Sequence, residues 1–360
     1  MGDEAARRVL ITGIAGHVAG RLAARLEADE GIEYVAGIDL VEPRHPLQRT
    51  EFIRADLRSP LVAKVVESTR VDTIVHLAVT ATPQDAGGRG RMKELNVIGS
   101  MQLLAAAQKA PLLRKLVVRS TTAVYGSSYR APSLLREDAE VEARPFHGYT
   151  KDVVEVEGYA RAFGRRRADA SLTLLRLANL VGPVVTSPLT RYFELPVVPT
   201  VLGYDPRLQF CHEDDALEVL YRSVAGDHPG IYNVAGPGVV YLSQAIRLAG
   251  KASVPVPLPL VNGTAAVVRR VAQLDFSPEQ LHFLLYGRVG DITRMRERFG
   301  FEPAYSTRTA FEEYAAARVE PLVDRATARR WERSLYRTAV RARAAAYERM
   351  ASRPSGMELS

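Results

Sequence analysis

The sequence predicts an α/β fold: a doubly wound parallel sheet with a smaller C-terminal lobe that binds the substrate. Two observations lead to this fold class. Short apolar runs alternate with amphipathic helical stretches through the first half of the 360-residue chain, and strands separated by helices pair in parallel through right-handed crossovers. After Gly182 and Pro183 the alternation weakens and proline becomes frequent, so the lobe is expected to begin there.

The expected elements follow one another at regular intervals. Apolar runs predict strands, and amphipathic runs predict helices. The last helix before the lobe has one apolar face, formed by Val153, Val156, Ala160 and Phe163. Strands are expected at residues 7–13, 34–39, 52–57, 72–78, 115–121 and 171–180, and helices at residues 17–29, 59–69, 91–110 and about 147–163.

Composition divides the chain into three segments. Residues 1–182 are expected to form a nucleotide-binding domain, whose sheet is completed by strands near 208–212 and 230–236. Residues 183–320 are expected to form mainly the substrate-binding lobe. Residues 321–360 read as an Arg-rich helical tail that packs on its own domain or on a second subunit.

Charge and cysteine content narrow the function classes. The net charge is +7, but the tail holds nine Arg against four acidic residues, so the rest of the chain is nearly neutral. Without a zinc-finger or RNA-binding signature, no nucleic-acid partner is expected. Cys211 is the only cysteine, which excludes an intrachain disulfide and a cysteine-rich metal site. With no secretory leader and no apolar run of membrane-spanning length, a cytoplasmic location is expected.

The segment TGIAGHVAG at residues 12–20 carries the first functional signal. Gly13, Gly16 and Ala19 are spaced by three residues between a strand and a helix, which lets the main chain approach a pyrophosphate at the helix N-terminus. Asp39 ends the second strand, where its carboxylate can accept a hydrogen bond from a ribose hydroxyl. The same carboxylate repels a 2′-phosphate, so NAD is predicted rather than NADP.

Further short motifs follow in a fixed order along residues 8–315. They are TGIAGHVA (12–19), ADL (55–57), VHLA (75–78), LNVIGS (95–100), STTAVYG (120–126), RLANLVGP (176–183), FCHEDDA (210–216) and GRVGD (287–291). In this order they resemble the extended short-chain dehydrogenase/reductase family, which contains nucleotide-sugar epimerases and dehydratases. The chain looks closest to actinobacterial UDP-sugar 4-epimerase-like members. The resemblance implies the family's Rossmann fold and an NAD cofactor.

The resemblance also implies roles for single residues. Thr121 corresponds to the catalytic Ser or Thr, while Asn179 and Arg288 correspond to residues that bind the substrate diphosphate. Asp56 corresponds to the aspartate that contacts adenine. The residues implied to bind the cofactor are Gly13, Gly16, Ala19, Asp39, Asp56, Leu57, Leu77, Ala78, Asn96 and Lys151.

The stretch FHGYTK at residues 146–151 departs from the family. The lysine of the family's YxxxK motif is present as Lys151, but His147 stands where the tyrosine is expected. Four residues apart on a helix, His147 and Lys151 share a face and can point at the same nicotinamide ribose. Histidine can transfer a proton at neutral pH, because its reference pKa is near 6.5. Tyr149 projects roughly 200° from position 147, so it cannot substitute without local unwinding.

Two functions remain open on the sequence. The first is an NAD-dependent epimerase/dehydratase-type enzyme, most simply an epimerase, which acts on a nucleotide-diphosphate sugar with Thr121, His147 and Lys151 as its catalytic residues. The second is an NAD-binding scaffold or sensor without turnover, because the family's tyrosine is replaced. Family members pair through helices, so the resemblance also implies a homodimer.

Overall fold

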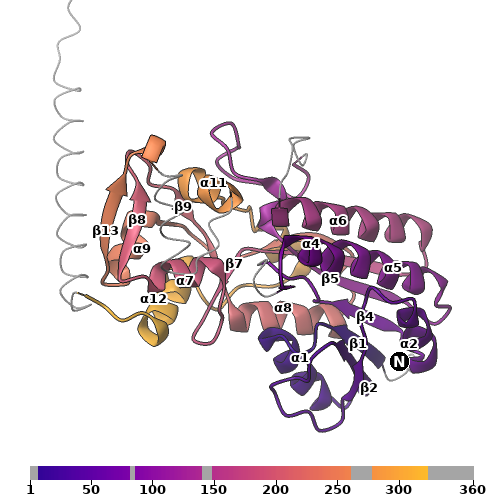
Figure 1. The fold of residues 1–360 in the computed structure, drawn as a ribbon. Helices are drawn as coiled ribbons and strands as arrows, with labels where there is room; N and C mark the ends of the chain where they lie inside the picture. Colours follow the sequence, from indigo (N-terminus) through magenta and orange to yellow (C-terminus); the bar gives the residue numbers. More distant parts are fainter. Residues whose placement is uncertain (1–6, 82–85, 140–147, 261–277, 323–360) are drawn as a thin grey trace, which may run out of the picture.

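The computed structural model describes residues 7–81, 86–139, 148–260 and 278–322, and its centre is a seven-stranded sheet (Figure 1). The strand order is β11-β6-β5-β4-β1-β2-β3, and every neighbouring pair is parallel. The chain builds the sheet outward from β1 in one direction and then in the other, which confirms the predicted doubly wound fold. The strands are β1 (Arg7–Thr12), β2 (Ile32–Asp39), β3 (Glu51–Arg54), β4 (Thr73–His76), β5 (Lys115–Thr121), β6 (Ser171–Leu177) and β11 (Gly230–Val234).

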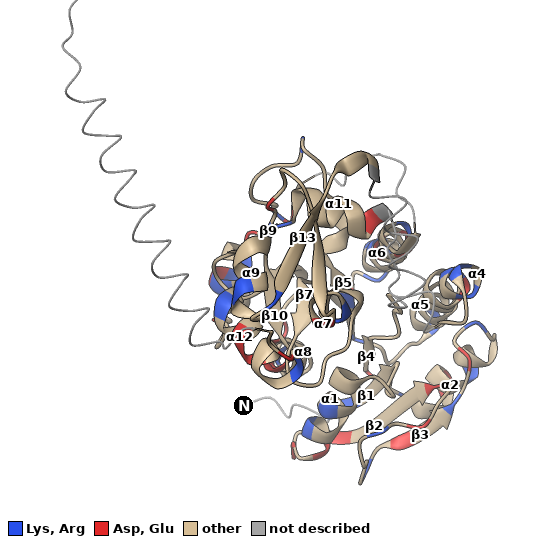
Figure 2. Ribbon diagram, turned by 60° about the vertical axis from the view of Figure 1, so that its left-hand side comes forward, with Lys and Arg blue, Asp and Glu red and all other residues tan. Residues whose placement is uncertain are grey.

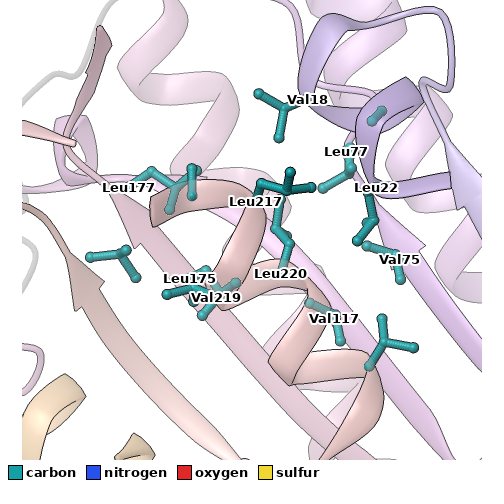
Figure 3. Packing of buried hydrophobic residues seen from close by; sticks show 14 of the residues in the cluster. Val18, Leu22, Val75, Leu77, Val117, Leu175, Leu177, Leu217, Val219 and Leu220 are labelled. Carbon is teal, nitrogen blue, oxygen red and sulfur yellow. The ribbon is translucent and has the colours of Figure 1, made fainter. Parts of the chain in front are cut away.

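Helices cover both faces of this sheet. On one face, α2 (Leu61–Thr69), α5 (Gly99–Lys109) and α6 (Gly148–Arg166) pack over a buried apolar cluster. On the other face lie α1 (His17–Glu27) and α8 (Glu213–Ala225), which contact each other. Figure 3 shows the apolar side chains between α8 and the sheet, with Leu217 and Leu220 of α8 close to Val75 and Val117. The chain therefore returns from the lobe to complete the core.

The apolar face predicted for the last helix of the first half is buried in α6. Its four residues, Val153, Val156, Ala160 and Phe163, are at most 2% exposed. The helix predicted at 91–110 consists of three consecutive segments: α4 (Arg89–Lys93), the π-helical turn η1 (Glu94–Ile98) and α5. Single π-turns within helices are frequent at functional sites, and this one contains Asn96.

The C-terminal lobe lies to one side of the sheet and has its own core (Figure 1). Aromatic rings form its centre: Phe311 lies edge-on to Phe193 and stacked on Phe210, with ring centroids 4.9 and 5.2 Å away. The lobe elements are α7 (Pro188–Glu194), β8 (Val197–Val201), β9 (Arg207–Leu208), β12 (Val240–Tyr241), α9 (Leu242–Leu248), β13 (Ala252–Val256), η3 (Leu258–Leu260), α11 (Pro278–Tyr286) and α12 (Thr307–Arg318). Two short helical turns, η2 (Thr122–Tyr125) and η4 (Met295–Phe299), lie outside it.

One strand predicted for the central sheet lies elsewhere. The segment near 230–236 forms β11 and pairs with β6, but Phe210–His212 forms β10, which pairs with β7 (Asn179–Val181) in a separate two-stranded sheet. The position next to β6 is taken by β11, whose Val234 carbonyl still accepts from Ala178 N at 2.9 Å, so β10 pairs instead with β7, beyond the end of β6. β10 follows β7 away from the sheet.

Charged residues of both signs are interspersed over the outer helices (Figure 2). Ion pairs link α1 to α8, among them Arg21 with Asp214 at 2.7 Å and Arg25 with Glu218 at 2.6 Å. Within the described ranges, no helix is both long enough and apolar enough to cross a membrane. The predicted Arg-rich tail lies outside the described residues from position 323 onward.

Candidate active site

The loop between β1 and α1 is the glycine-rich segment, and its shape requires glycine. Gly13 has φ +75°, and a Cβ there would lie 2.8 Å from Ala78 Cα, so the loop packs directly on the main chain after β4. Gly16 precedes α1 in an extended conformation, and no side chain caps this helix end. The first N–H groups of α1 therefore have no acceptor within the helix, which suits a pyrophosphate. Ala19 lies within α1 and packs into the core.

Asp39 ends β2 beside this loop. Its Oδ2 accepts a hydrogen bond from Ala15 N at 3.0 Å, and its Oδ1 accepts one from Leu40 N at 2.7 Å. These contacts hold a half-buried carboxylate at the edge of the glycine loop. The glycine-rich loop and Asp39, which are the two strongest indications of a cofactor in the sequence, therefore lie next to each other. Their geometry fits a dinucleotide.

Other predicted cofactor residues lie at the same edge of the sheet. Leu77 N donates to the carbonyl of the last β1 residue at 3.2 Å, which places Leu77 and Ala78 alongside the glycine loop. Asp56 is bound by the Arg58 guanidinium at 2.6 Å, and this hydrogen bonding lowers the Asp56 pKa. The carboxylate is therefore ionised at neutral pH and remains partly exposed. Leu57, the next residue, is buried.

Asn96 is completely buried in the π-turn. Its amide exchanges two hydrogen bonds with the main chain of Thr80, at 2.8 and 2.9 Å, and its Nδ2 lies 3.3 Å from Asp152 Oδ2. Thr80 belongs to the loop after β4 that lines the cavity described next. The contacts make Asn96 a support for that loop.

A cavity of about 470 Å³ opens where the carboxyl ends of the strands meet the lobe. Its walls come from the loop after β4, the end of β5, the first turn of α6, the segment from β6 to β7, and the helices α7 and α11. Ligands of open α/β sheets bind at this edge. The polar side chains of the wall include Thr80, Arg119, Thr121, Tyr149, Asn179, Arg191, Glu279 and Arg288.

Three residues predicted for catalysis or substrate binding line this cavity: Thr121, Asn179 and Arg288. Thr121 is the last residue of β5, and its Oγ1 accepts a hydrogen bond from Ala123 N at 3.2 Å. With one acceptor site used in this way, its hydroxyl hydrogen is available for a ligand. Asn179 begins β7, at the point where the chain leaves the sheet.

Arg288 brings a positive charge to the cavity. Its Nε is buried and has no hydrogen-bond partner among the described residues, and its guanidinium lies 4.9 Å from the centre of the Phe283 ring. Burial lowers the Arg288 pKa to about 10, and interactions with Tyr149 and Glu279 oppose that shift. Arg288 is therefore charged at neutral pH, and a bound anion would offset the cost of its burial.

The start of α6 presents side chains other than those that the sequence predicts. The helix begins at Gly148, in the left-handed region at φ +60°, and Tyr149 lines the cavity. Lys151 is exposed and is not among the residues that line this cavity, so its predicted role at the nicotinamide ribose stays a prediction. His147 lies outside the described residues. Tyr149, which the spacing argument set aside, is the tyrosine of this stretch that the structure places in the cavity.

Arg89 fixes the first turn of α6. Its guanidinium donates to the two carboxylate oxygens of Asp152 at 2.6 and 2.7 Å and to the Gly148 carbonyl at 2.7 Å. Asp152 is completely buried, so this pair is shielded from solvent on one side. The direction of Tyr149 is therefore set by a helix that is tied to α4.

Behind the end of β5 lies a buried ionic network that the sequence analysis did not find. Glu157 accepts hydrogen bonds from Ser120 Oγ at 2.6 Å and from Arg176 Nε and Nη2 at 2.9 and 2.7 Å. Arg176 also donates to Tyr125 Oη at 2.7 Å. Burial raises the Glu157 pKa, but the contacts with Arg176 and Ser120 and the charge of Arg161 together outweigh this effect and hold the pKa below its usual value. Because Ser120 precedes Thr121, the network supports the catalytic strand end from behind.

Comparisons with known proteins agree with this geometry. Residues 9–235 match the model of the NAD dependent epimerase/dehydratase family. An uncharacterized protein of Mycobacterium tuberculosis is 43% identical over 330 residues, covering 90% of this chain and 88% of that protein. UDP-glucuronic acid decarboxylase 5 of Arabidopsis thaliana is 25% identical over 327 residues, covering 84% and 86%. UDP-glucose 4-epimerase of Thermotoga maritima, solved with UDP-glucose, has a similar fold, with a TM-score of 0.64, 18% identity and coverage of 86% and 97%.

Proposed function

Because the chain belongs to the NAD dependent epimerase/dehydratase family, we propose that it transiently oxidises a hydroxyl of a nucleotide-diphosphate sugar to a ketone, as an epimerase does. Membership confirms the family and the NAD cofactor that the sequence predicted. The observation that carries the proposal is one cavity whose wall includes Gly16 of the glycine loop, Thr121, Tyr149 and Arg288. Cofactor, reacting hydroxyl and diphosphate can all be reached from this space.

The charge of the cavity supports the substrate class. Arg288 offers a buried guanidinium nitrogen without a hydrogen-bond partner among the described residues, and arginine binds phosphate oxygens through strong charge-assisted hydrogen bonds. Asn179 lines the same cavity and can donate its amide to a phosphate oxygen. The plant relative is named for UDP-glucuronic acid, and the epimerase structure holds UDP-glucose, so both are associated with a nucleoside diphosphate sugar.

The carboxyl ends of β1, β2 and β4 would hold NAD. In this arrangement the main chain of Gly13 and Gly16 faces the pyrophosphate, Asp39 accepts from the ribose, and Asp56 accepts from the adenine. Bound NAD supplies the hydride acceptor for the reacting carbon.

The proton of the reacting hydroxyl requires an acceptor from the protein. Thr121 can donate a hydrogen bond to that oxygen, and Tyr149 lines the same cavity and can take the proton at its phenol oxygen. His147, which the sequence predicts as the acceptor with Lys151 as its partner, is the second candidate and lies outside the described residues. The proposed homodimer and cytoplasmic location likewise remain predictions.

The test is to add a panel of nucleotide sugars to the purified protein loaded with NAD. Absorbance at the NADH band reports reduction of the bound cofactor, and NMR of the sugar reports interconversion. We expect at least one sugar to give both signals. If the protein binds NAD and the sugars but gives neither signal, the alternative of a scaffold or sensor without turnover is correct.

A further inference from the structure

Arg119 is a charged residue of the cavity to which the sequence assigned no role. It lies on β5, two residues before Thr121, and it lines the cavity. No hydrogen bond or ion pair joins it to another residue in the described part of the chain. A half-buried guanidinium with no hydrogen-bond partner among the described residues carries a desolvation cost, so a function at this position is expected.

Tyr149 of the neighbouring helix and the buried His76 both feel this charge, and of the two only Tyr149 lines the cavity. Arg119 and Tyr149 line the same cavity, from the end of β5 and the first turn of α6. Burial raises the Tyr149 pKa, and the positive charge of Arg119, followed by that of Arg288, opposes the rise. Asp152 acts in the other direction, but Arg89 binds it directly. Of the neighbouring positive charges, Arg119 therefore lowers the Tyr149 pKa the most.

Among the described residues that line the cavity, no cation comes from α6. Lys151 is exposed and, two residues after Tyr149, projects roughly 200° away from it around the helix. Four residues after Tyr149, where a side chain would lie on the same face, stands Val153, which is completely buried in an apolar cluster with Val124 and Leu135. Positive charge reaches the phenol from the strand and from Arg288.

We propose that Tyr149 and Arg119 form the proton-transfer pair of this site, with the phenol of α6 as acid and base and the guanidinium of β5 as its cation. The proposal rests on the proposed function. The Tyr149 pKa stays above its ordinary value, and Tyr149 reacts in its phenolate form, which the charge of Arg119 favours. In the oxidation step, this phenolate takes the proton of the substrate hydroxyl and becomes a phenol. The substrate carbon gives its hydride to bound NAD⁺, and a C=O bond replaces the C–H and O–H bonds. In the return step, the phenol gives the same proton back.

The charged groups around the phenol come from several elements. Arg119 approaches from β5, Arg288 from the segment after α11, and Asp152 from the next turn of α6. Glu279 of α11 lies against the main chain of α6 at Gly148 and interacts with Arg288. Because Arg288 and Glu279 oppose each other, Arg119 is expected to have the largest separable effect on the ionisation of Tyr149.

A direct titration of residue 149 tests the pair without requiring turnover. 3,5-Difluorotyrosine is placed at position 149, where its lower intrinsic pKa brings the ionisation into a range in which the protein is folded, and ¹⁹F NMR follows the pH titration. We expect Arg119→Met to raise the measured pKa by about one unit or more, because an opposite charge close to an acid typically shifts its pKa by that amount. Arg119→Lys should restore most of the shift.

Arg165→Met is the matched control, since Arg165 is exposed near the other end of α6. It removes the same charge and should leave the titration unchanged. Circular dichroism confirms that each variant is folded. An unchanged titration in folded Arg119→Met overturns the proposal, as does a larger shift from Lys151→Met than from Arg119→Met.

Two further readouts separate this proposal from the proposed function. In the unlabelled enzyme, Arg119→Met should move the rising limb of the pH–rate profile to higher pH, and Arg119→Lys should move it back. If wild type reduces no bound NAD but the titration shift is present, the pair exists and the proposed function fails. If NAD is reduced and the titration shift is absent, the proposed function holds and the pair is wrong.

Discussion

The cofactor cradle and the catalytic wall of this site are built in different ways. The cradle consists of Gly13, Gly16 and Asp39 at the ends of β1 and β2, where the path of the main chain and one carboxylate fixed by main-chain N–H groups define the site. The catalytic wall consists of Thr121 and Tyr149, together with the neighbouring Arg119, at the end of β5 and the start of α6. There the direction of each side chain decides whether it reaches the ligand. Direction changes by about 100° per residue on a helix, so a small change in register moves a different residue into the site.

The groups behind the two regions also differ in charge. Behind the cradle, His76 bridges the hydroxyls of Thr12 and Ser100, each at 2.7 Å, and burial lowers its pKa to about 4, so it is neutral. Behind the wall, Glu157 and Arg176 form a buried ion pair. Removing one partner of a buried ion pair lowers the free energy of unfolding more than changing a neutral group does. Substitutions behind the wall are therefore expected to destabilise the protein more than substitutions behind the cradle.

The largest effect on stability is expected from Arg176→Met. The change leaves Glu157 charged and buried without its main partner, which typically costs about 3–5 kcal/mol in the free energy of unfolding. The double variant Arg176→Met, Glu157→Leu removes both charges and should recover much of the loss. Urea unfolding measures both. If the double variant is as unstable as the single one, loss of packing rather than an unpaired charge is the cause.

In the cradle, Gly13→Val should weaken NAD binding by roughly a hundredfold. Valine is strained at φ +75°, and its Cβ would meet the main chain at Ala78, so the loop must move away from the pyrophosphate position. Gly90→Ala is the control, because nothing lies within 4 Å of a Cβ there. Calorimetric titration with NAD compares the two. Near-normal affinity in Gly13→Val would mean that this loop does not hold the pyrophosphate.

Because His76 is neutral and buried behind the cradle, the free energy of unfolding should fall in acid. Its folded-state pKa is depressed, so the stabilisation from keeping it neutral is present above its unfolded pKa near 6.5 and is lost as the pH falls toward about 4. By pH 5 the loss should reach roughly 2 kcal/mol. His76→Gln cannot titrate and should show a flatter dependence between pH 8 and 5. Unfolding free energies across this range test the difference, and parallel curves would assign the acid sensitivity to other groups.

A smaller effect is expected from Asp39→Asn, which changes the cofactor preference. Removing the negative charge relieves repulsion of a 2′-phosphate, so the ratio of the NADP to NAD dissociation constants should fall by roughly tenfold. The amide oxygen can still accept from Ala15 N, so the loop should keep its shape. Titration with both cofactors measures the ratio. Tighter binding of NADP than NAD by wild type would show that another residue overrides Asp39.

The sequence predicts the cradle from signals that are local. Gly13 is required by the turn itself, at φ +75°, and Asp39 ends a strand whose position follows from hydrophobic alternation. Parallel strands then place their carboxyl ends at one edge without further information. The predicted position of β10 is wrong for the complementary reason: β10 pairs with β7 because β11 takes the place beside β6, and this choice of partner is a tertiary contact with no local signal.

The wall was harder to predict because the motif spacing and the buried face of α6 indicate different sides of this helix. The spacing of His147 and Lys151 favours one face of the helix, whereas the buried stripe that contains Val153 and Val156 defines another. Tyr149 precedes Val153 by four residues and lies on the buried side, so the sequence held a signal for it. Arg119 had no such signal, because only the tertiary fold places this strand residue beside the start of α6.

The central claim, that Tyr149 accepts the proton of the substrate hydroxyl, is tested most directly by the rate of cofactor reduction. Rapid mixing of NAD-loaded protein with a reactive nucleotide sugar measures the rate of cofactor reduction in Tyr149→Phe and in His147→Phe. Tyr149→Phe should slow reduction by about 10²- to 10⁴-fold, since positioned acid–base groups contribute this much. His147→Phe should have a much smaller effect, and NAD affinity should be unchanged in both. A large loss in His147→Phe, with near-normal reduction in Tyr149→Phe, would contradict the assignment and return catalysis to the face of His147 and Lys151.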